Sequence, residues 1–253
     1  MKYLTMKTIA AAALAALASG AGADQSGHAI DREGAVKSPA APETRAAFDI
    51  LAAHVQRTGR TVTFRMTTNG TAGAERPEPS GALGGAPVLS YVWPTTLGPE
   101  AVGFEPATGI LALAATSHPD FDDTPLFDEN GDGDLGNDGD DWHSHWVVLV
   151  PSEGCGPGAL AVRDIPEGAQ PRLPATWPGL PIFIDSPGYT PRFDGPEIAL
   201  TVGLAEPGAF DGMAYDGVTA ALRVDANLHA PLLCVSDVFD VASGDLSLPG
   251  RME

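Results

Sequence analysis

The residues best suited to chemistry lie close together, between positions 118 and 145 of the 253-residue chain. Three of the six histidines fall in this stretch, among a dense run of aspartates. Two of them, His143 and His145, are one residue apart in an aromatic and β-branched run, 142–150, that is typical of a strand. Alternate side chains of a strand share a face, so both imidazoles are expected on one side, at a spacing that lets them bind the same metal ion.

A third ligand is expected from the strand-like run that precedes the acidic stretch, 110–115. His118 follows this run directly, and two aspartates come next. A hairpin between the two runs would bring these groups together. The predicted metal ligands are His118, Asp120, Asp122, His143 and His145, with zinc or copper as the ion because imidazole suits both. The alternative is that His143 and His145 are hydrogen-bonded structural residues at a sheet edge.

A second metal motif lies between these histidines. The segment Asp128-Glu129-Asn130-Gly131-Asp132-Gly133-Asp134 resembles the first half of the EF-hand calcium loop of calmodulin-like and dockerin-like proteins, with oxygen ligands at alternate positions and a glycine at the sharp turn. It departs from that family where Gly139 replaces the bidentate glutamate, and its flanks indicate loop and strand, so the EF-hand fold is not implied. The resemblance implies calcium bound within this segment, by Asp128, Asn130, Asp132 and Asp134, and the aspartates that follow, Asp138, Asp140 or Asp141, could complete the ligand set. The alternative is a solvated acidic loop.

Three functions are compatible with these motifs. The first is an exported soluble metal-binding protein with calcium in the acidic loop and zinc or copper at the histidines. The second is a periplasmic metalloenzyme, in which the same histidines leave a coordination position open and a neighbouring aspartate is the general base: Asp120, Asp122 or Asp123. The third is a calcium-stabilised carbohydrate-binding or adhesive domain, whose stacking platform would be formed by Trp93, Trp177 and Tyr189.

The net negative charge of the chain limits the classes of partner that it is expected to bind. Acidic residues outnumber basic ones 33 to 14, for a net charge of -19 at pH 7. We do not expect the protein to bind nucleic acid, because phosphate recognition needs a basic surface. Metal ions are the expected partners, and protein partners cannot be named from the sequence.

The N-terminal residues predict export. Lysines precede an apolar run, and Ala21-Gly22-Ala23 has the small-x-small form that signal peptidase cleaves, so residues 1–23 are interpreted as a signal peptide. We therefore expect a periplasmic or secreted protein. No later segment is apolar for the roughly 20 residues that a transmembrane helix needs. In an oxidising compartment the two cysteines, Cys155 and Cys234, are expected to form a disulfide.

The remaining chain favours an all-β fold. Residues 24–42 are polar and are predicted to form a disordered leader, and 43–253 a single domain. Apolar residues at helical spacing predict one N-terminal helix over 43–56. Short apolar or β-branched runs separated by turn residues then indicate an antiparallel β-sandwich or jelly roll with long loops. These runs span 61–66, 88–92, 110–115, 142–150, 159–162, 182–184, 198–204, 218–224 and 232–238.

Overall fold

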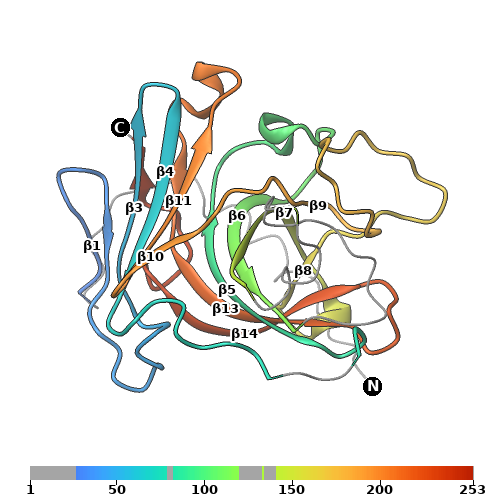
Figure 1. The fold of residues 1–253 in the computed structure, drawn as a ribbon, viewed down its shortest axis with the longest axis horizontal. Helices are drawn as coiled ribbons and strands as arrows, with labels where there is room; N and C mark the ends of the chain where they lie inside the picture. Colours follow the sequence, from blue (N-terminus) through green and yellow to red (C-terminus); the bar gives the residue numbers. More distant parts are fainter. Residues whose placement is uncertain (1–26, 79–81, 120–132, 134–140, 253) are drawn as a thin grey trace, which may run out of the picture.

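The computed structural model describes residues 27–78, 82–119, 133 and 141–252. The predicted signal peptide, 1–23, lies outside these residues. The described part consists mainly of antiparallel strands, which confirms the all-β prediction. Figure 1 shows two layers, a sheet on the left and a barrel on the right.

The barrel is a closed ring of six strands. It closes because β6 pairs with both β5 and β7, while β8 connects β7 to β14. In order around the ring the strands are β6 (Ile110–Ser117), β5 (Pro87–Pro94), β13 (Val218–Val224), β14 (Leu233–Val241), β8 (Leu160–Val162) and β7 (His143–Pro151). The short strand β9 (Ile184–Asp185) pairs with β7. The predicted sandwich or jelly roll is therefore wrong, since these six strands form one closed sheet.

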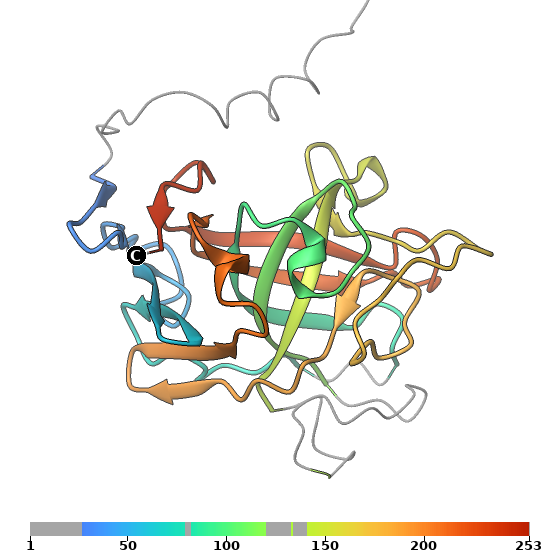
Figure 2. The same cartoon turned by 90° about the horizontal axis from the view of Figure 1, so that it is seen from above.

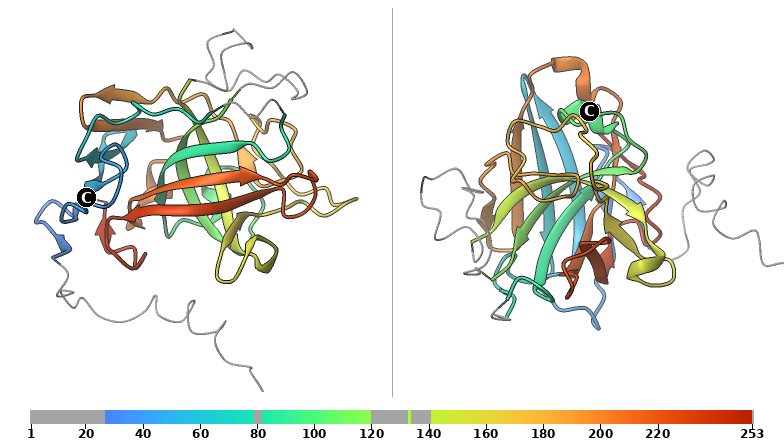
Figure 3. Two further views of the ribbon diagram at one scale, coloured as in Figure 1. Left: turned by 90° about the horizontal axis from the view of Figure 1, so that it is seen from below. Right: turned by 90° about the vertical axis from the view of Figure 1, so that its right-hand side faces the viewer.

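The second layer, called here the outer sheet, packs against one side of the barrel (Figures 2 and 3). Its strands are, in spatial order, β1 (Ala29–Ile30), β2 (Val36–Lys37), β3 (Ile50–Thr58), β4 (Thr61–Thr68), β11 (Glu197–Gly203) and β10 (Arg192–Asp194). A two-stranded ladder of β12 (Ala214–Tyr215) and β15 (Gly250–Arg251) completes the described strands.

Alternate residues of the barrel strands belong to two different hydrophobic cores. On β6, Ala112 and Ala114 contribute to the cluster inside the barrel, whereas Leu111, Leu113 and Ala115 contribute to the cluster shared with the outer sheet. The interior cluster consists of alanines, valines and other aliphatic side chains, which fits the narrow space enclosed by six strands. Most of the large aromatic side chains lie in the other cluster, between the two layers.

The predicted helix over 43–56 is wrong, because this segment contains a turn followed by strand β3. A β-bulge between Ile50 and Ala52 inserts one extra residue into the strand. The bulge interrupts strict alternation, so the apolar residues acquire a spacing that resembles a helical face. Pairing with β4 across a two-residue turn, Thr58 opposite Thr61, stabilises the strand in place of the helix.

Helical structure in the described part of the chain is limited to three short 3-10 turns. They are η2 (Pro99–Val102), η3 (Glu153–Cys155) and η4 (Pro207–Phe210). Among these residues there is no helix with the length and apolar character needed to span a membrane.

The predicted disordered leader, 24–42, is corrected over residues 27–42. Strands β1 and β2 form a hairpin there, and β2 pairs with β3. Val36 is buried, 1% exposed, in the core between the layers. Ile30 and Val36 are the only large apolar side chains between residues 24 and 42, which is a weak sequence signal for a strand. Pairing with β3 is what fixes β2 in place.

Cys155 and Cys234 form the predicted disulfide, with their Cα atoms 5.5 Å apart. Cys155 ends η3, just after β7, and Cys234 lies at the start of β14. The bond therefore links the segment that follows β7 to strand β14, and β8 lies between these two strands in the barrel.

A buried carboxylate, Asp216, organises the turn that follows β12. It is 0% exposed. Its Oδ1 accepts hydrogen bonds from the backbone N–H of Gly217 at 2.8 Å and of Ser243 at 3.1 Å, and its Oδ2 accepts one from Ser243 Oγ at 2.5 Å. Burial raises the pKa of Asp216 above its ordinary value of 3.8, although these hydrogen bonds act in the opposite direction.

We expect Asp216→Asn to gain stability relative to the wild type as the pH rises. Because the pKa of Asp216 is raised on folding, the protonated Asp216 stabilises the wild type fully at pH values below the unfolded-state pKa, about 3.9. The wild type loses this contribution as the pH rises through the folded-state pKa. Asparagine does not ionise, and its amide can accept from both N–H groups while donating to the serine oxygen. Urea unfolding of both proteins at pH 4 and pH 7 measures the effect. A stability difference that stays the same at both pH values would contradict it.

Candidate metal centre

The hairpin of β6 and β7 places two of the predicted metal ligands inside the barrel. Thr116 is opposite His143 and Ala114 is opposite His145, which confirms the proposed pairing of these two strand runs. Ala114 belongs to the interior cluster, so both histidines project from the interior face. They are 0% and 3% exposed. His118 follows the end of β6 and is half-buried.

The imidazole rings of His118 and His145 each lie next to the ring of His143. The ring centres of His118 and His143 are 5.0 Å apart, and those of His143 and His145 are 4.8 Å apart, both pairs edge to face. Two imidazoles bound to one tetrahedral zinc ion have ring centres about 5 Å apart. As placed, however, the described residues contain no group of three His, Cys, Asp or Glu side chains arranged around one metal position.

Each ring has its Nδ1 atom next to a backbone carbonyl oxygen. The partners are Pro119 O at 3.2 Å for His118, Asp141 O at 2.9 Å for His143 and Asp185 O at 3.2 Å for His145. A carbonyl oxygen only accepts, so in each hydrogen bond Nδ1 carries the proton. In a neutral imidazole the lone pair is then on Nε2, the atom that binds a metal in this tautomer.

Two hydroxyl groups lie against the same rings. Thr116 Oγ1 is 3.1 Å from Nε2 of His143, to which it donates in this tautomer, and Ser186 Oγ is 3.2 Å from Nδ1 of His145. The threonine therefore occupies the position at which a metal ion would bind His143. Sequence reasoning missed both residues. Thr116 directly follows the predicted strand run 110–115, and Ser186 is 41 positions away from its histidine partner.

The opposite face of β7 is held in the core between the layers. Trp142 packs against Tyr91, with ring centres 5.0 Å apart, and its Nε1 donates to Gly73 O at 3.1 Å. Trp146 packs edge to face against Phe64 at 6.0 Å. These contacts confirm the predicted alternation along the strand. They also restrict its rotation, so the histidine face is held towards the barrel interior.

Asp185 is a buried acid beside the histidines that the sequence did not single out. Burial raises the pKa of its carboxyl group, and a hydrogen bond from Thr176 Oγ1, at 2.7 Å, acts in the opposite direction. Asp185 lies on β9 opposite Trp146, so the two side chains project from the same face of the sheet. Its backbone carbonyl oxygen accepts the hydrogen bond from His145.

The remaining predicted ligands, apart from Asp141, lie outside the described residues. They are Asp120 and Asp122 of the predicted histidine site, and Asp128, Asn130, Asp132, Asp134, Asp138 and Asp140 of the predicted calcium loop. The general-base candidate Asp123 lies outside them as well.

Comparison with known proteins finds no relative. No protein-family model matches the chain, and no curated protein or solved structure matches it either. The function of the protein is therefore inferred from its own geometry.

The predicted stacking platform does not form as a surface feature. Trp93 is 0% exposed and belongs to the core between the layers. Trp177 and Tyr189 are both half-buried, and they pack against different hydrophobic clusters. These three residues therefore do not form the exposed stacking platform that the carbohydrate-binding hypothesis required.

Proposed function

We propose that the protein binds a transition-metal ion, zinc or copper, through Nε2 of His118, His143 and His145. The observation that supports this best is a hydrogen bond common to the three rings, each of which donates Nδ1–H to a backbone carbonyl. Metal-binding histidines commonly make this outer hydrogen bond, because it fixes the tautomer and the ring orientation.

Metal binding requires two local changes in this proposal. The hydroxyl of Thr116 leaves Nε2 of His143, and the ring of His118, the least buried of the three, turns towards the other two. Both changes are side-chain rotations at the end of a rigid hairpin. The proposal is limited to binding, since the three general-base candidates named from the sequence, Asp120, Asp122 and Asp123, lie outside the described residues.

A calcium ion in the acidic loop, 128–140, is a second part of the proposal and rests on the EF-hand resemblance alone. An extracytoplasmic location is the third. The Cys155–Cys234 disulfide supports it, because disulfides persist mainly in oxidising compartments.

Removing one ligand should abolish tight transition-metal binding. After chelator treatment, we expect the wild type to bind about one zinc ion, and His143→Ala or His145→Ala to lose at least about 100-fold in affinity, since even an outer hydrogen-bond partner is worth 10- to 100-fold. Isothermal titration with zinc measures this, and a separate calcium titration tests the loop. The matched control is His229→Ala, which removes an exposed histidine. Equal affinity in all four proteins, or no zinc binding by the wild type, would reject the site.

A second variant covers the case in which the buried alanine variants fail to fold. Thr116→Val keeps the shape of the side chain and removes the hydroxyl that competes for Nε2 of His143. If the ring binds metal, zinc affinity should be equal or higher. A loss of affinity in a folded Thr116→Val protein would indicate that the threonine itself contributes to binding, against the proposed ligand set.

A further inference from the structure

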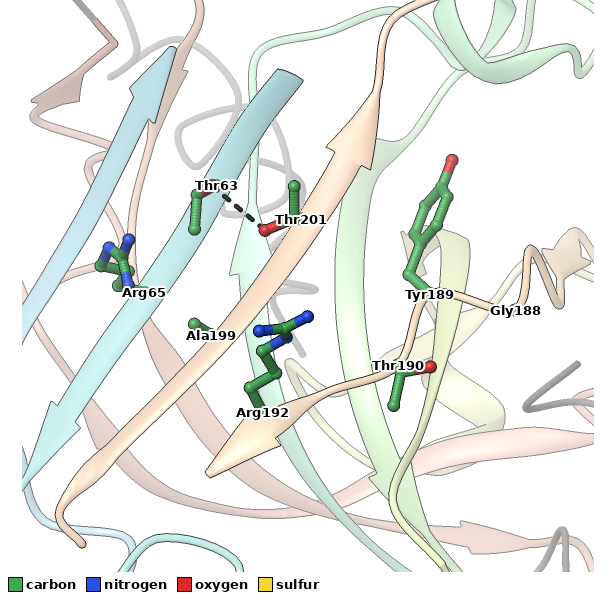
Figure 4. Close-up of a pocket in the computed structure, with 8 residues that line it drawn as sticks. All are labelled: Thr63, Arg65, Gly188, Tyr189, Thr190, Arg192, Ala199 and Thr201. Atoms are coloured by element: carbon green, nitrogen blue, oxygen red, sulfur yellow. Dashed lines mark hydrogen bonds between the residues drawn. The ribbon is translucent and has the colours of Figure 1, made fainter. Parts of the chain in front are cut away.

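A polar groove lies on the solvent face of the outer sheet. Its volume is about 610 Å³. Figure 4 shows it over β4 and β11, bounded on the other side by the segment 188–192 that leads into β10. Its lining residues are Thr63, Arg65, Gly188, Tyr189, Thr190, Arg192, Ala199 and Thr201. None of them belongs to the histidine site.

The register of three strands creates the groove. Arg65 on β4 is opposite Ala199 on β11, and Ala199 is in turn opposite Arg192 on β10. Neighbouring strands are about 4.8 Å apart, so the two arginine backbones are about 10 Å apart on the same face. The alanine between them is small, which leaves space above β11 that a larger side chain would fill.

The two arginines differ in how their charge is neutralised. Arg65 forms an ion pair with Glu197 at 3.1 Å, with both side chains about 40% exposed, 39% and 42%. Arg192 is exposed and forms no ion pair or side-chain hydrogen bond with any of the residues that the structure describes. In the view of Figure 4 its guanidinium group lies between β11 and the segment that carries Tyr189 and Thr190. In a chain with a net charge of -19, an arginine left unpaired in a groove is suited to an external anion.

The other groups at the groove are hydroxyls. Thr63 and Thr201 are hydrogen-bonded to each other at 3.2 Å, and each oxygen keeps further donor or acceptor capacity. Thr190 adds a third hydroxyl on the opposite side (Figure 4). Hydroxyls of this kind match the hydroxyl groups of a sugar, and the volume lies within the range of about 300–1,000 Å³ that is usual for small-molecule sites.

We propose that this groove binds an acidic sugar, with the Arg192 guanidinium holding its carboxylate or sulfate group and the threonine hydroxyls contacting its ring hydroxyls. A guanidinium group forms two parallel hydrogen bonds to either oxyanion. The groove shares no lining residue with the proposed metal centre, so the two proposals can be tested separately.

The test compares three sugars of similar size by saturation-transfer NMR and calorimetry at low salt: a galacturonate oligomer, a sulfated galactose oligomer and a neutral galactose oligomer. We expect binding of one or both acidic sugars and none of the neutral one. Arg192→Gln should weaken it about 10-fold or more, as expected for loss of a charge-assisted hydrogen bond. Arg192→Lys, which keeps the charge without the planar fork, should be intermediate.

Two controls make the outcome decisive. Arg223→Gln removes an exposed arginine on β13, away from the groove, and should bind like the wild type. Titrations in EDTA should match those without it, which excludes binding through a metal ion. The proposal is overturned if no acidic sugar binds, if the neutral sugar binds equally, if Arg192→Gln binds normally, if Arg223→Gln loses as much, or if EDTA removes binding.

Discussion

Loss of the disulfide in a Cys155→Ala/Cys234→Ala double variant is expected to lower the free energy of unfolding by about 4.5 kcal/mol. The two residues are 79 positions apart, and closing a loop of that length removes much of the conformational entropy of the unfolded chain. An effect of this size is a large fraction of the 5–15 kcal/mol that typically stabilises a folded protein.

The position of this bond also predicts where in the structure its loss has the largest effect. Strands β14 and β8 are joined by a single residue pair, Cys234 opposite Ala161, so the barrel closes through little hydrogen bonding at this point. The disulfide reinforces that connection. Removing it should therefore increase opening of β8 and β14 more than opening of the outer sheet.

Urea unfolding and amide hydrogen exchange measure the two effects. The reduced wild type serves as the matched control, because it loses the same bond and keeps both side chains. An unchanged free energy of unfolding in the double variant would contradict the first effect. Equal increases in exchange over the barrel and the outer sheet would contradict the second.

Truncation of Trp93 in Trp93→Ala is expected to cost about 3–5 kcal/mol, the range for large aromatic residues removed from a core. Trp93 is 0% exposed, and its ring centre is 6.1 Å from that of Phe64 across the interface between barrel and outer sheet. Its Nε1 donates to Arg65 O at 3.1 Å. The substitution leaves a cavity between the two sheets, and neither sheet can move to fill it without disturbing its packing against the other.

The matched control is Trp177→Ala, which truncates a half-buried tryptophan at the edge of the interior cluster. Its Nε1 donates to Leu180 O, only three residues away, so this residue does not connect the two layers. We expect a smaller loss than for Trp93→Ala in chemical unfolding. If Trp177→Ala lowered the free energy of unfolding as much as Trp93→Ala, the core between the layers would contribute no more to stability than the edge of the interior cluster.

Several features of the protein follow from its sequence alone. The alternation of apolar and polar residues predicted the antiparallel strands, and it predicted that His143 and His145 share one face of β7. Two cysteines in a chain with an expected export signal predicted their pairing. Each of these depends on local periodicity or on a composition that leaves one choice, so no knowledge of distant contacts was needed.

Other features were decided only by the tertiary structure. The helix predicted over 43–56 became a strand because a bulge gives β3 a helix-like spacing, and only pairing with β4 distinguishes the two. The barrel replaced the sandwich because β8 joins β7 to β14, and a closed ring and an open sheet have the same alternation within each strand. The carbonyl group of Asp185 that orients His145 is 40 residues away, and the groove at Arg192 depends on the register of β4, β11 and β10. Hydrogen bonding between strands far apart in the chain determines these arrangements, and the order of residues within one strand does not encode its partner.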